Sequence, residues 1–467
     1  MGEDDFVHPY IPNSVPEVKQ EMLREIGVKS AEELYSEMIP QRLRLNDPLD
    51  LPEPFTGELD LKRHVEGILG RDVDVKDYLS FLGGGCWGHY VPAVCSEIAG
   101  RSEFLTAYAG GSYSDLGRFQ AVFEFQSMIG ELVGMEVSGL PTYDWGSSVG
   151  NSVRMAQRLT GRSKVLVPRI ISPARLSIIR TFAQLPVMPG HIEIEEVGYD
   201  PETGHLDLSD LESKIDGETA AVYVENPSYL GVVETEGQEI AGIAHSHGAE
   251  FVVGVDPITL GVLVPPSDYG ADIVCGDIQP LGIPMFAGGG LGGFIASRDE
   301  ERYVAEYPLR LISITENDRG EYGFGQCRFD RTSYIGRDKA KDWIGTTTAL
   351  WAITAGVYMA LMGLQGMREV GEAILRKARY AANRLSEIEG VEIPLTGFFK
   401  EFIVNFDGVD REVSEINGEL GARGIFGGKD VSQEFPELGQ SALYCVTETH
   451  SKDELDRLVT NLREVLA

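Results

Sequence analysis

The sequence is poor in cysteine and contains no long apolar run. Its five cysteines are widely separated and include no Cys-x-x-Cys pair, which argues against a disulfide framework and a zinc knuckle. No histidine or cysteine lies at helical spacing to complete a metal site, so we predict no metal. No apolar run approaches the roughly 18–20 residues that span a bilayer, and the first residues lack the pattern of a signal peptide. We therefore expect a cytoplasmic protein.

Positive charge is scarce relative to negative charge. The chain has 40 Lys and Arg against 73 Asp and Glu, which gives a formal net charge of −33. Such a chain repels phosphate backbones and anionic lipid, so we predict that it binds neither nucleic acid nor membranes.

The composition is that of a globular protein, with 467 residues, 43% of them hydrophobic and 24% charged. Residues 1–70 combine helix-start signals with several prolines and predict an N-terminal helical arm. After about residue 90, amphipathic helices alternate with β-branched runs at 164–168, 219–226, 250–256, 271–277 and 292–297. This alternation predicts a large α/β domain over 71–335, with a mostly parallel sheet covered by helices. An apolar helical stretch at 340–366 then links it to a small α+β C-terminal domain, so that the last region covers 336–467.

Ligands of open α/β sheets bind at the carboxyl ends of the strands, where two segments carry suitable residues. The small residues around Ser147 and Ser148 precede a helix and either cradle a phosphate or permit tight helix packing. Asp256 ends a strand run and either pairs with a protonated ring nitrogen or caps a helix.

The same order is found in fold-type I pyridoxal-phosphate enzymes, in which a lysine some 20 positions after the aspartate forms the Schiff base. Here that position is Gln279, whose amide cannot form an aldimine. No lysine lies between Gly237 and Gly293 to replace it.

The chain resembles a known family over nearly its whole length. The segments that carry the resemblance are YIPNS near the N-terminus, FLGGGCWGHYVPAV (81–94), RSEFLTAY (101–108), FQAVFEFQSMIGELVGME (119–136), GDIQPLG (276–282), FKEF (399–402) and YCVTETHSKDELDRLV (444–459). They are similar to subunit 1 of the two-subunit glycine decarboxylase, the P-protein of the glycine cleavage system. The resemblance implies an α/β fold of the fold-type I pyridoxal-phosphate-dependent transferase class.

In that family, the resemblance implies, subunit 1 lacks the cofactor lysine and a homologous subunit 2 carries it. The two assemble as an α2β2 heterotetramer and act on glycine with the lipoylated H-protein. We therefore predict no catalytic residue in this chain alone, no covalently bound cofactor, and pyridoxal phosphate on the partner. A vestigial pocket would contain Tyr143, Ser147, Ser148, Asn151, Asp256 and Gln279. The isolated chain is expected either to form a homodimer through the surface that binds subunit 2 or to be prone to aggregation.

The chain departs from the family pattern at 109–118, at 341–350 and in the glycine run 287–293. Such segments would lie near the subunit junction. We therefore name as candidate partner-facing residues His89, Ser112, Tyr113 and Arg118. Three alternatives stay open: a divergent subunit with another amino-acid substrate, a structural or regulatory pseudoenzyme, and a module that holds pyridoxal phosphate noncovalently.

Overall fold

The computed structural model describes residues 7, 10–45, 49–105, 116–184, 190–341, 344 and 347–467. The chain forms two compact units, Met1–Val73 and Asp74–Ala467. This division places no boundary at 335, so the predicted separation of residues 71–335 from 336–467 stays a prediction.

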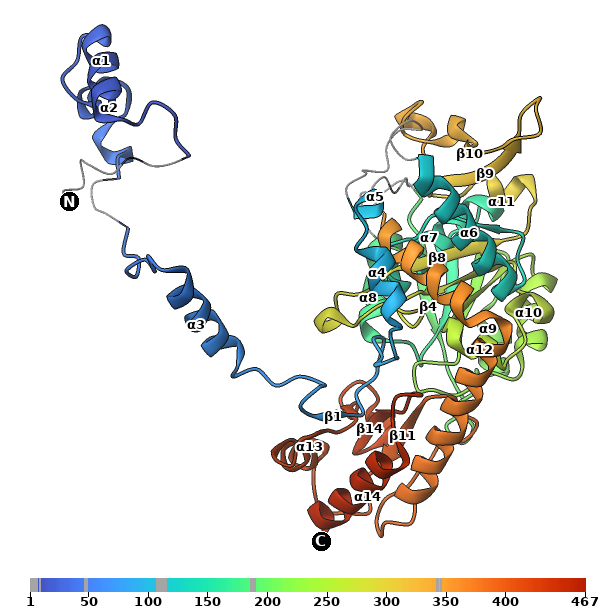
Figure 1. Cartoon of the computed structure of the whole chain (residues 1–467). Coiled ribbons are helices and arrows are strands. Elements are labelled where there is room, and N and C mark those ends of the chain that lie inside the picture. Colours follow the sequence, from blue (N-terminus) through green and yellow to red (C-terminus); the bar gives the residue numbers. More distant parts are fainter. Residues whose placement is uncertain are drawn as a thin grey trace. The chain divides into compact units, whose positions relative to one another are not determined.

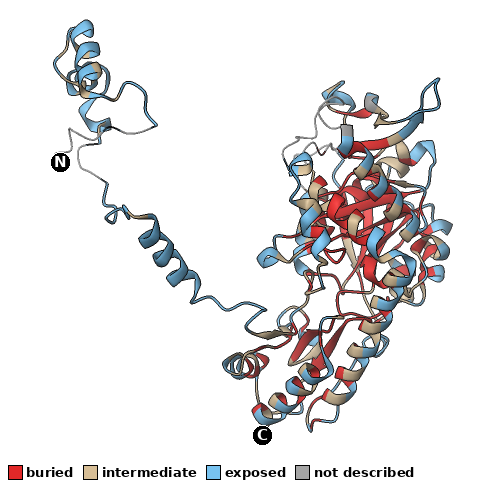
Figure 2. Ribbon diagram, viewed as in Figure 1, coloured by how far each residue is buried: buried red, intermediate tan, exposed pale blue. Residues whose placement is uncertain are grey.

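The first unit consists of short helices (Figure 1). Its elements are α1 (Pro16–Ile26), α2 (Ala31–Met38), the 3-10 turn η2 (Gln41–Leu43) and α3 (Glu58–Leu69). Helix α1 begins at a proline, whose fixed φ suits the first helical turn, and ends at Gly27 in the left-handed conformation. None of the described residues of this unit is buried (Figure 2).

The second unit is built around a seven-stranded sheet with the order β2-β8-β7-β6-β5-β3-β4. Its strands are β2 (Val137–Ser138), β3 (Lys164–Pro168), β4 (Glu193–Val197), β5 (Thr219–Asn226), β6 (Glu250–Val255), β7 (Ile273–Asp277) and β8 (Gly293–Ser297). Strands β3 to β7 are parallel, and β8 runs antiparallel to β2 and β7. All five predicted strands are confirmed. The sequence pattern missed β2 and β4 because an edge strand that is short or polar lacks a β-branched apolar run.

Helices cover both faces of this sheet. Along β5, Val222 and Val224 join one core, which includes residues of α6 (Leu116–Val133), α10 (Gly237–Ser246) and α12 (Ala349–Leu385). Ala221 and Tyr223 point to the opposite face and join a second core with residues of α7 (Trp145–Thr160) and α8 (Pro173–Ala183). Alternate residues of a strand point to opposite faces, so a strand buried on both faces is apolar throughout.

Smaller elements complete the second unit. A three-stranded sheet joins β11 (Glu401–Asn405), β14 (Ser441–Cys445) and β13 (Lys429–Asp430), and β1 (Leu79–Ser80) pairs with β12 (Ile425–Phe426). Strands β9 (Leu311–Glu316) and β10 (Tyr322–Cys327) form a hairpin. The remaining helices are α4 (Ala93–Ala99), α5 (Ser102–Leu105), α9 (Leu208–Lys214), α11 (Glu301–Val304), α13 (Val413–Ala422) and α14 (Lys452–Leu466), with 3-10 turns η3 (Pro257–Gly261), η4 (Pro266–Tyr269), η5 (Phe286–Gly288), η6 (Phe329–Arg331), η7 (Arg337–Lys339) and η8 (Pro436–Leu438).

Helix α12 connects two hydrophobic cores. It begins at Ala349 and is interrupted at Gly363, whose φ of 58° and ψ of −173° are not helical. Its residues up to Ile374 pack in the core of the large sheet, and Ala378–Leu385 pack in the core around β11 and β14. Its length and composition would suffice to cross a membrane, yet 44% of its most apolar window is buried within the structure. Because residues along its length belong to both hydrophobic cores, the helix packs as part of the interior of the structure.

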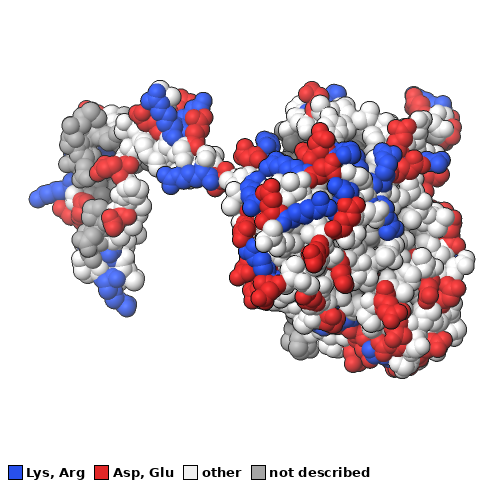
Figure 3. All heavy atoms as spheres, turned by 90° about the horizontal axis from the view of Figure 1, so that it is seen from below, with Lys and Arg blue, Asp and Glu red and all other residues white. Residues whose placement is uncertain are grey.

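Charges of both signs are spread over the surface that Figure 3 shows. Acidic side chains are dispersed over this face, and lysine and arginine side chains are interspersed among them. Mixed charge of this kind is typical of a solvated surface. The expectation that the chain binds no nucleic acid stays a prediction.

Candidate functional site

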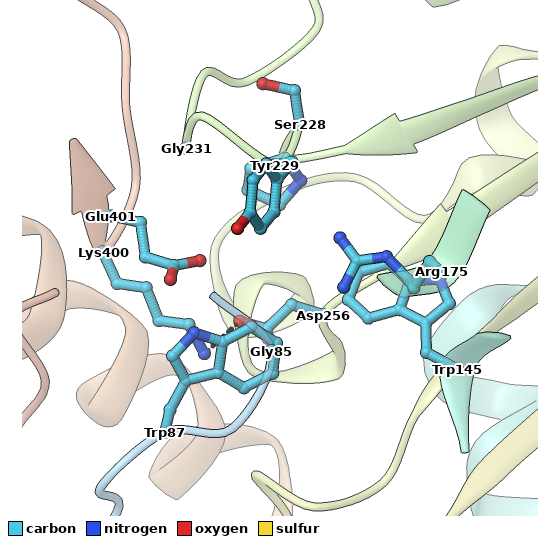
Figure 4. Close-up of a pocket in the computed structure, with 11 residues that line it drawn as sticks. Gly85, Trp87, Trp145, Arg175, Ser228, Tyr229, Gly231, Asp256, Lys400 and Glu401 are labelled. Carbon is cyan, nitrogen blue, oxygen red and sulfur yellow. Dashed lines mark ion pairs between the residues drawn. The ribbon is translucent and has the colours of Figure 1, made fainter. Parts of the chain in front are cut away.

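A small cavity lies at the carboxyl edge of the large sheet, where open α/β sheets bind ligands (Figure 4). The residues that line it are Gly85, Trp87, Trp145, Arg175, Pro227, Ser228, Tyr229, Gly231, Asp256, Lys400 and Glu401. Its volume is about 20 Å³. A site for a small organic molecule or cofactor needs roughly 300 Å³ or more, whereas one water needs roughly 10–15 Å³. The cavity is therefore the size of a water molecule.

The Asp256 carboxylate is paired with a lysine of the chain itself. Oδ2 of Asp256 lies 2.6 Å from Nζ of Lys400, and both side chains are 4% exposed. Oδ1 accepts a hydrogen bond from the backbone N–H of Ile258, which caps η3. Of the two roles proposed for Asp256, the structure shows the cap of a helical turn. In the other role the carboxylate would pair with a protonated ring nitrogen, but here it pairs with the ammonium of Lys400.

Lys400, which directly precedes β11, also contacts the loop at 81–92. Its Nζ lies 3.2 Å from Nε2 of His89 and 3.5 Å from the centre of the Trp87 ring. Nδ1 of His89 lies 2.8 Å from Oε2 of Glu448. Although burial alone would raise it, the charge and hydrogen bond of His89 lower the pKa of Glu448 to about 2. A chain of ion-pair and hydrogen-bond contacts thus runs from Asp256 through Lys400 and His89 to Glu448.

Gln279 is fully enclosed and makes three hydrogen bonds to backbone groups. Its Oε1 accepts from the N–H of Trp87 at 3.1 Å, and its Nε2 donates to the carbonyls of Trp87 at 3.0 Å and Ile283 at 3.1 Å. The residue is 1% exposed. The amide at the predicted Schiff-base position therefore binds backbone groups of its own chain.

The N-terminus of α7 is capped by a carboxylate of the same chain. Oδ1 of Asp144 accepts hydrogen bonds from the backbone N–H and the hydroxyl of Ser147, at 2.7 and 2.6 Å. Ser148 is buried and bonds to Thr142 and to the carbonyl of Asp144, and Asn151 donates to the carbonyl of Ser147. Tyr143, just outside the cap, is half exposed. The predicted phosphate cradle thus holds a carboxylate in place of a phosphate.

A second buried carboxylate lies behind this cap. Asp277 accepts hydrogen bonds from the N–H groups of Gln279 and Trp145. Burial, with the negative charge of Asp144 in addition, raises the pKa of Asp277 to about 7 against the effect of these donors. Two carboxylates therefore occupy a region that would have to accept the negative charge of a phosphate.

The opposite wall of the cavity is a second internal ion pair. The guanidinium of Arg175 binds both carboxylate oxygens of Glu225, at 2.7 and 2.6 Å, and lies 4.3 Å from the centre of the Trp145 ring. Nε1 of Trp145 donates to the hydroxyl of Tyr223 at 3.1 Å. Trp87 and Trp145 are both buried in the core, and each has a cation over one face. One face of each ring is therefore covered by a cation of the chain itself.

Cys86 is not activated as a nucleophile. Burial, with the negative charge of Asp277 in addition, raises the pKa of Cys86 to about 11. The thiol therefore remains protonated at neutral pH, whereas nucleophilic cysteines react as thiolates.

The candidate partner-facing residues divide into three groups. Ser112 and Tyr113 lie outside the described residues. Arg118, on α6, is 8% exposed and donates a hydrogen bond to the carbonyl of Phe104. The side chain of His89 is 1% exposed; its Nδ1 contacts Glu448 and its Nε2 contacts Lys400. The expectation that His89 faces a partner is corrected, because a histidine between a buried carboxylate and a buried ammonium turns inward.

Sequence reasoning missed Lys400 and Arg175, which line the cavity, and Glu448, which contacts His89 beside it. No lysine lies between Gly237 and Gly293, whereas Lys400 enters the site from the residue before β11. Both Lys400 and Glu448 lie within segments that carry the family resemblance, FKEF and YCVTETHSKDELDRLV. That overlap was the only available signal.

Pyridoxal phosphate does not fit this site. The cavity is an order of magnitude too small, Asp256 is already paired, and the α7 N-terminus is capped by Asp144. The lysine that reaches the site cannot replace the missing one, because its ammonium contacts Asp256 directly and leaves no room for a ring between them. Noncovalent binding through Ser147, Ser148 and Asp256 is therefore not supported.

Fold and site together define the class of the protein: a fold-type I pyridoxal-phosphate enzyme fold whose cofactor position is occupied by its own side chains. Comparison with known proteins identifies the family. The family model "Glycine cleavage system P-protein" matches residues 8–462. The chain belongs to this family of pyridoxal-phosphate-dependent glycine decarboxylases, as its sequence predicts.

Individual relatives extend over the whole chain. The protein named probable glycine dehydrogenase (decarboxylating) subunit 1 of Pyrococcus abyssi is 41% identical, over 98% of this chain and 99% of its own length. The protein of the same name from Staphylothermus marinus is 38% identical, over 98% of both chains. A crystal structure of glycine decarboxylase (P-protein) of the glycine cleavage system, in inhibitor-bound form, is 34% identical, covers 99% of this chain and 100% of that chain, and has a TM-score of 0.83.

A more distant structure shares the fold alone. Sphingosine-1-phosphate lyase of Burkholderia pseudomallei is 15% identical, covers 92% of this chain and 94% of that chain, and has a TM-score of 0.64. The predicted fold class is thereby confirmed.

Proposed function

We propose that this chain is subunit 1 of a glycine dehydrogenase (decarboxylating), the glycine-decarboxylating component of a glycine cleavage system. The observation that carries the proposal is Gln279, an amide at the Schiff-base position, in a chain 37–41% identical to proteins named subunit 1. A chain that cannot form the aldimine and has no room for the cofactor needs a partner that does both.

The proposal assigns the chemistry to a homologous subunit 2. Pyridoxal phosphate, bound there to a lysine, would supply the electron sink for decarboxylation of glycine. The aminomethyl group would pass to the lipoyl arm of the H-protein. This chain would supply the other half of an α2β2 assembly in the cytoplasm, and its own small cavity would take no part in the reaction.

Reconstitution tests this function. We would co-express the chain with the lysine-bearing homologue of its source organism, purify through a tag on this chain, and measure glycine–bicarbonate exchange with lipoylated H-protein. We expect co-purification and exchange by the pair, and no exchange by this chain alone. Failure of the two to associate would refute the proposal. Exchange with another amino acid in preference to glycine would favour the divergent subunit.

The isolated chain offers a second test. It is expected to be colourless with added pyridoxal phosphate, and borohydride is expected to leave no reduced adduct on Lys400, because its ammonium is held by Asp256. The Gln279→Lys variant is expected to remain inactive, since the surrounding groups are arranged for an amide. An adduct on Lys400 would show that the cavity opens enough to admit the cofactor.

The assembly state gives a third test. A fold-type I pair buries a large interface, of about 2,000 Å² or more as in obligate complexes. We expect the isolated chain to form a homodimer through the same surface. A stable monomer at micromolar concentration in light scattering would count against this mode of assembly.

A further inference from the structure

Residues 83–90, with the sequence GGGCWGHY, form a segment without regular secondary structure, which we call the glycine-rich loop. Side chains from distant parts of the chain bind its backbone at several points. Glu401 accepts from the N–H of Gly84 at 2.6 Å, and the Thr447 hydroxyl donates to the carbonyl of Gly88 at 2.7 Å. Glu448 accepts from the N–H of Tyr90 at 2.7 Å. The loop is therefore held from outside by side chains.

Gln279 binds the middle of this loop in a way that few side chains can reproduce. It accepts from the N–H and donates to the carbonyl of the same residue, Trp87, as a neighbouring strand would. An amide has both a donor and an acceptor at its end, whereas lysine has only donors and an ionised glutamate has only acceptors. Because the residue is 1% exposed, a backbone group that loses this partner has no water to replace it.

The first residues of the glycine-rich loop need to be glycine, because neighbouring side chains approach closely and the backbone has positive φ. A Cβ atom on Gly83 would lie 2.2 Å from Oε1 of Glu401, and Gly84 and Gly85 have φ of 90° and 128°. Such values favour glycine. The loop ends at Tyr90, whose side chain is 65% exposed although its backbone N–H is bound by Glu448. An exposed tyrosine on a firmly held backbone is typical of the residues that dominate protein interfaces.

We propose that Gln279 is a positioning residue: its amide clamps Trp87 and holds the glycine-rich loop so that Tyr90 is presented to subunit 2. The clamp follows from the hydrogen bonds of this chain, and the role of Tyr90 rests on the proposed function. The side chain at the lost Schiff-base position thus orders a surface element of this subunit.

Hydrogen exchange of the isolated chain tests the clamp without any partner. Gln279→Ala removes all three hydrogen bonds, and Gln279→Glu keeps the shape of the side chain but loses both donors. We expect exchange in peptides covering 83–90 to become about ten-fold faster in both variants. The control is Gln126→Ala, which removes another buried glutamine whose amide donates to a backbone carbonyl, that of Ser138. It is expected to leave exchange at 83–90 unchanged.

Titration with subunit 2 tests the presentation of Tyr90. We expect Gln279→Glu and Tyr90→Ala to raise the concentration of this chain needed for half-maximal exchange activity by about ten-fold, with a smaller effect on activity at saturation. Tyr90→Ala is expected to leave hydrogen exchange at 83–88 unchanged, because that side chain makes no part of the clamp.

The outcomes separate the two claims. Unchanged exchange at 83–90 in both Gln279 variants would overturn the clamp. Faster exchange with unaltered binding of subunit 2 would overturn the role of Tyr90. If the wild-type chain fails to bind subunit 2, the proposed function and the role of Tyr90 are both wrong, while the hydrogen-exchange result still decides the clamp.

Discussion

The small cavity at the sheet edge and the N-terminal unit differ in how far their side chains are buried and paired within the chain. Around the cavity, Asp256 pairs with Lys400 and Glu225 with Arg175, and each of these side chains is at most 9% exposed. In the N-terminal unit, the apolar face of α3 contains Leu61, Val65 and Ile68, which are 42–48% exposed. The charged side chains at the cavity are paired with one another inside the chain, whereas the apolar side chains of α3 remain exposed to solvent.

This difference indicates where each region contributes free energy. Paired and buried charges stabilise the chain that contains them only while both partners are present. A helix of twelve residues is marginal alone and needs a surface on which to bury its apolar face. We therefore expect substitutions at the cavity to change the stability of this chain, and substitutions on α3 to change its association.

The largest effect is expected from Lys400→Met. The substitution leaves the Asp256 carboxylate buried without a partner, which typically costs about 3–5 kcal/mol in the free energy of unfolding. Urea denaturation measures the change. The matched control is Lys452→Met, because Lys452 pairs with Asp456 but its side chain is 69% exposed; its loss should be much smaller than that of Lys400→Met. Equal losses in the two variants would contradict the distinction between buried and exposed pairs.

Glu448→Gln should act in a pH-dependent way. The folded-state pKa of Glu448 is about 2, below its ordinary value of 4.5. Its ionised form therefore stabilises the protein above about pH 4.5, and this contribution is lost as the pH falls toward 2. We expect the variant to lose about 3 kcal/mol at pH 7 and the difference from wild type to shrink below pH 4.

Unfolding curves of Glu448→Gln and wild type at several pH values measure this difference. Glu66→Gln is the control from α3, where Glu66 pairs with Lys62 at 3.8 Å between exposed side chains. It is expected to follow the wild type at every pH. A Glu448 effect that does not depend on pH would contradict the lowered pKa.

Glycine-to-alanine substitutions should change stability in opposite directions in the two regions. At Gly83 a new Cβ atom would meet Glu401 at 2.2 Å and Cβ of Cys445 at 2.8 Å, so we expect a loss of about 1–3 kcal/mol. At Gly67, within α3, a Cβ atom would meet nothing within 4 Å, and alanine should stabilise the helix by about 0.5–1 kcal/mol. Urea denaturation measures the first, and hydrogen exchange of the 58–69 peptide the second. Destabilisation at Gly67 would show that α3 is packed more closely.

The smallest change in stability is expected from Leu61→Ser and Ile68→Ser together. Both side chains are about half exposed, so the free energy of unfolding should stay within about 0.5 kcal/mol of the wild type. If the arm packs on subunit 2, the same variant should bind that subunit about ten-fold more weakly. Lys62→Ser is the control. Unaltered binding in a titration would show that α3 packs elsewhere.

The sequence predicted the central part of the fold because its signals are local. Runs such as 219–226 are apolar and β-branched throughout, which is required of a strand buried on both faces. The bounds of the linking helix differ from the prediction: the apolar stretch was expected to be helical over 340–366, whereas α12 begins at Ala349, is interrupted at Gly363 and continues to Leu385. The described residues of 340–348 are not helical although they continue the stretch, because sequence periodicity places helix ends poorly.

The sequence by itself determined that this chain cannot form a Schiff base with the cofactor. Gln279 stands where a Schiff-base lysine would, and an amide cannot form an aldimine in any fold. Only the tertiary structure decided what occupies the place of the cofactor. Gln279 and Trp87 are 192 residues apart in the chain, and Lys400 reaches Asp256 from another sheet. Periodicity reports which face of an element is buried, whereas the partner of each buried polar group is set by the packing of distant elements.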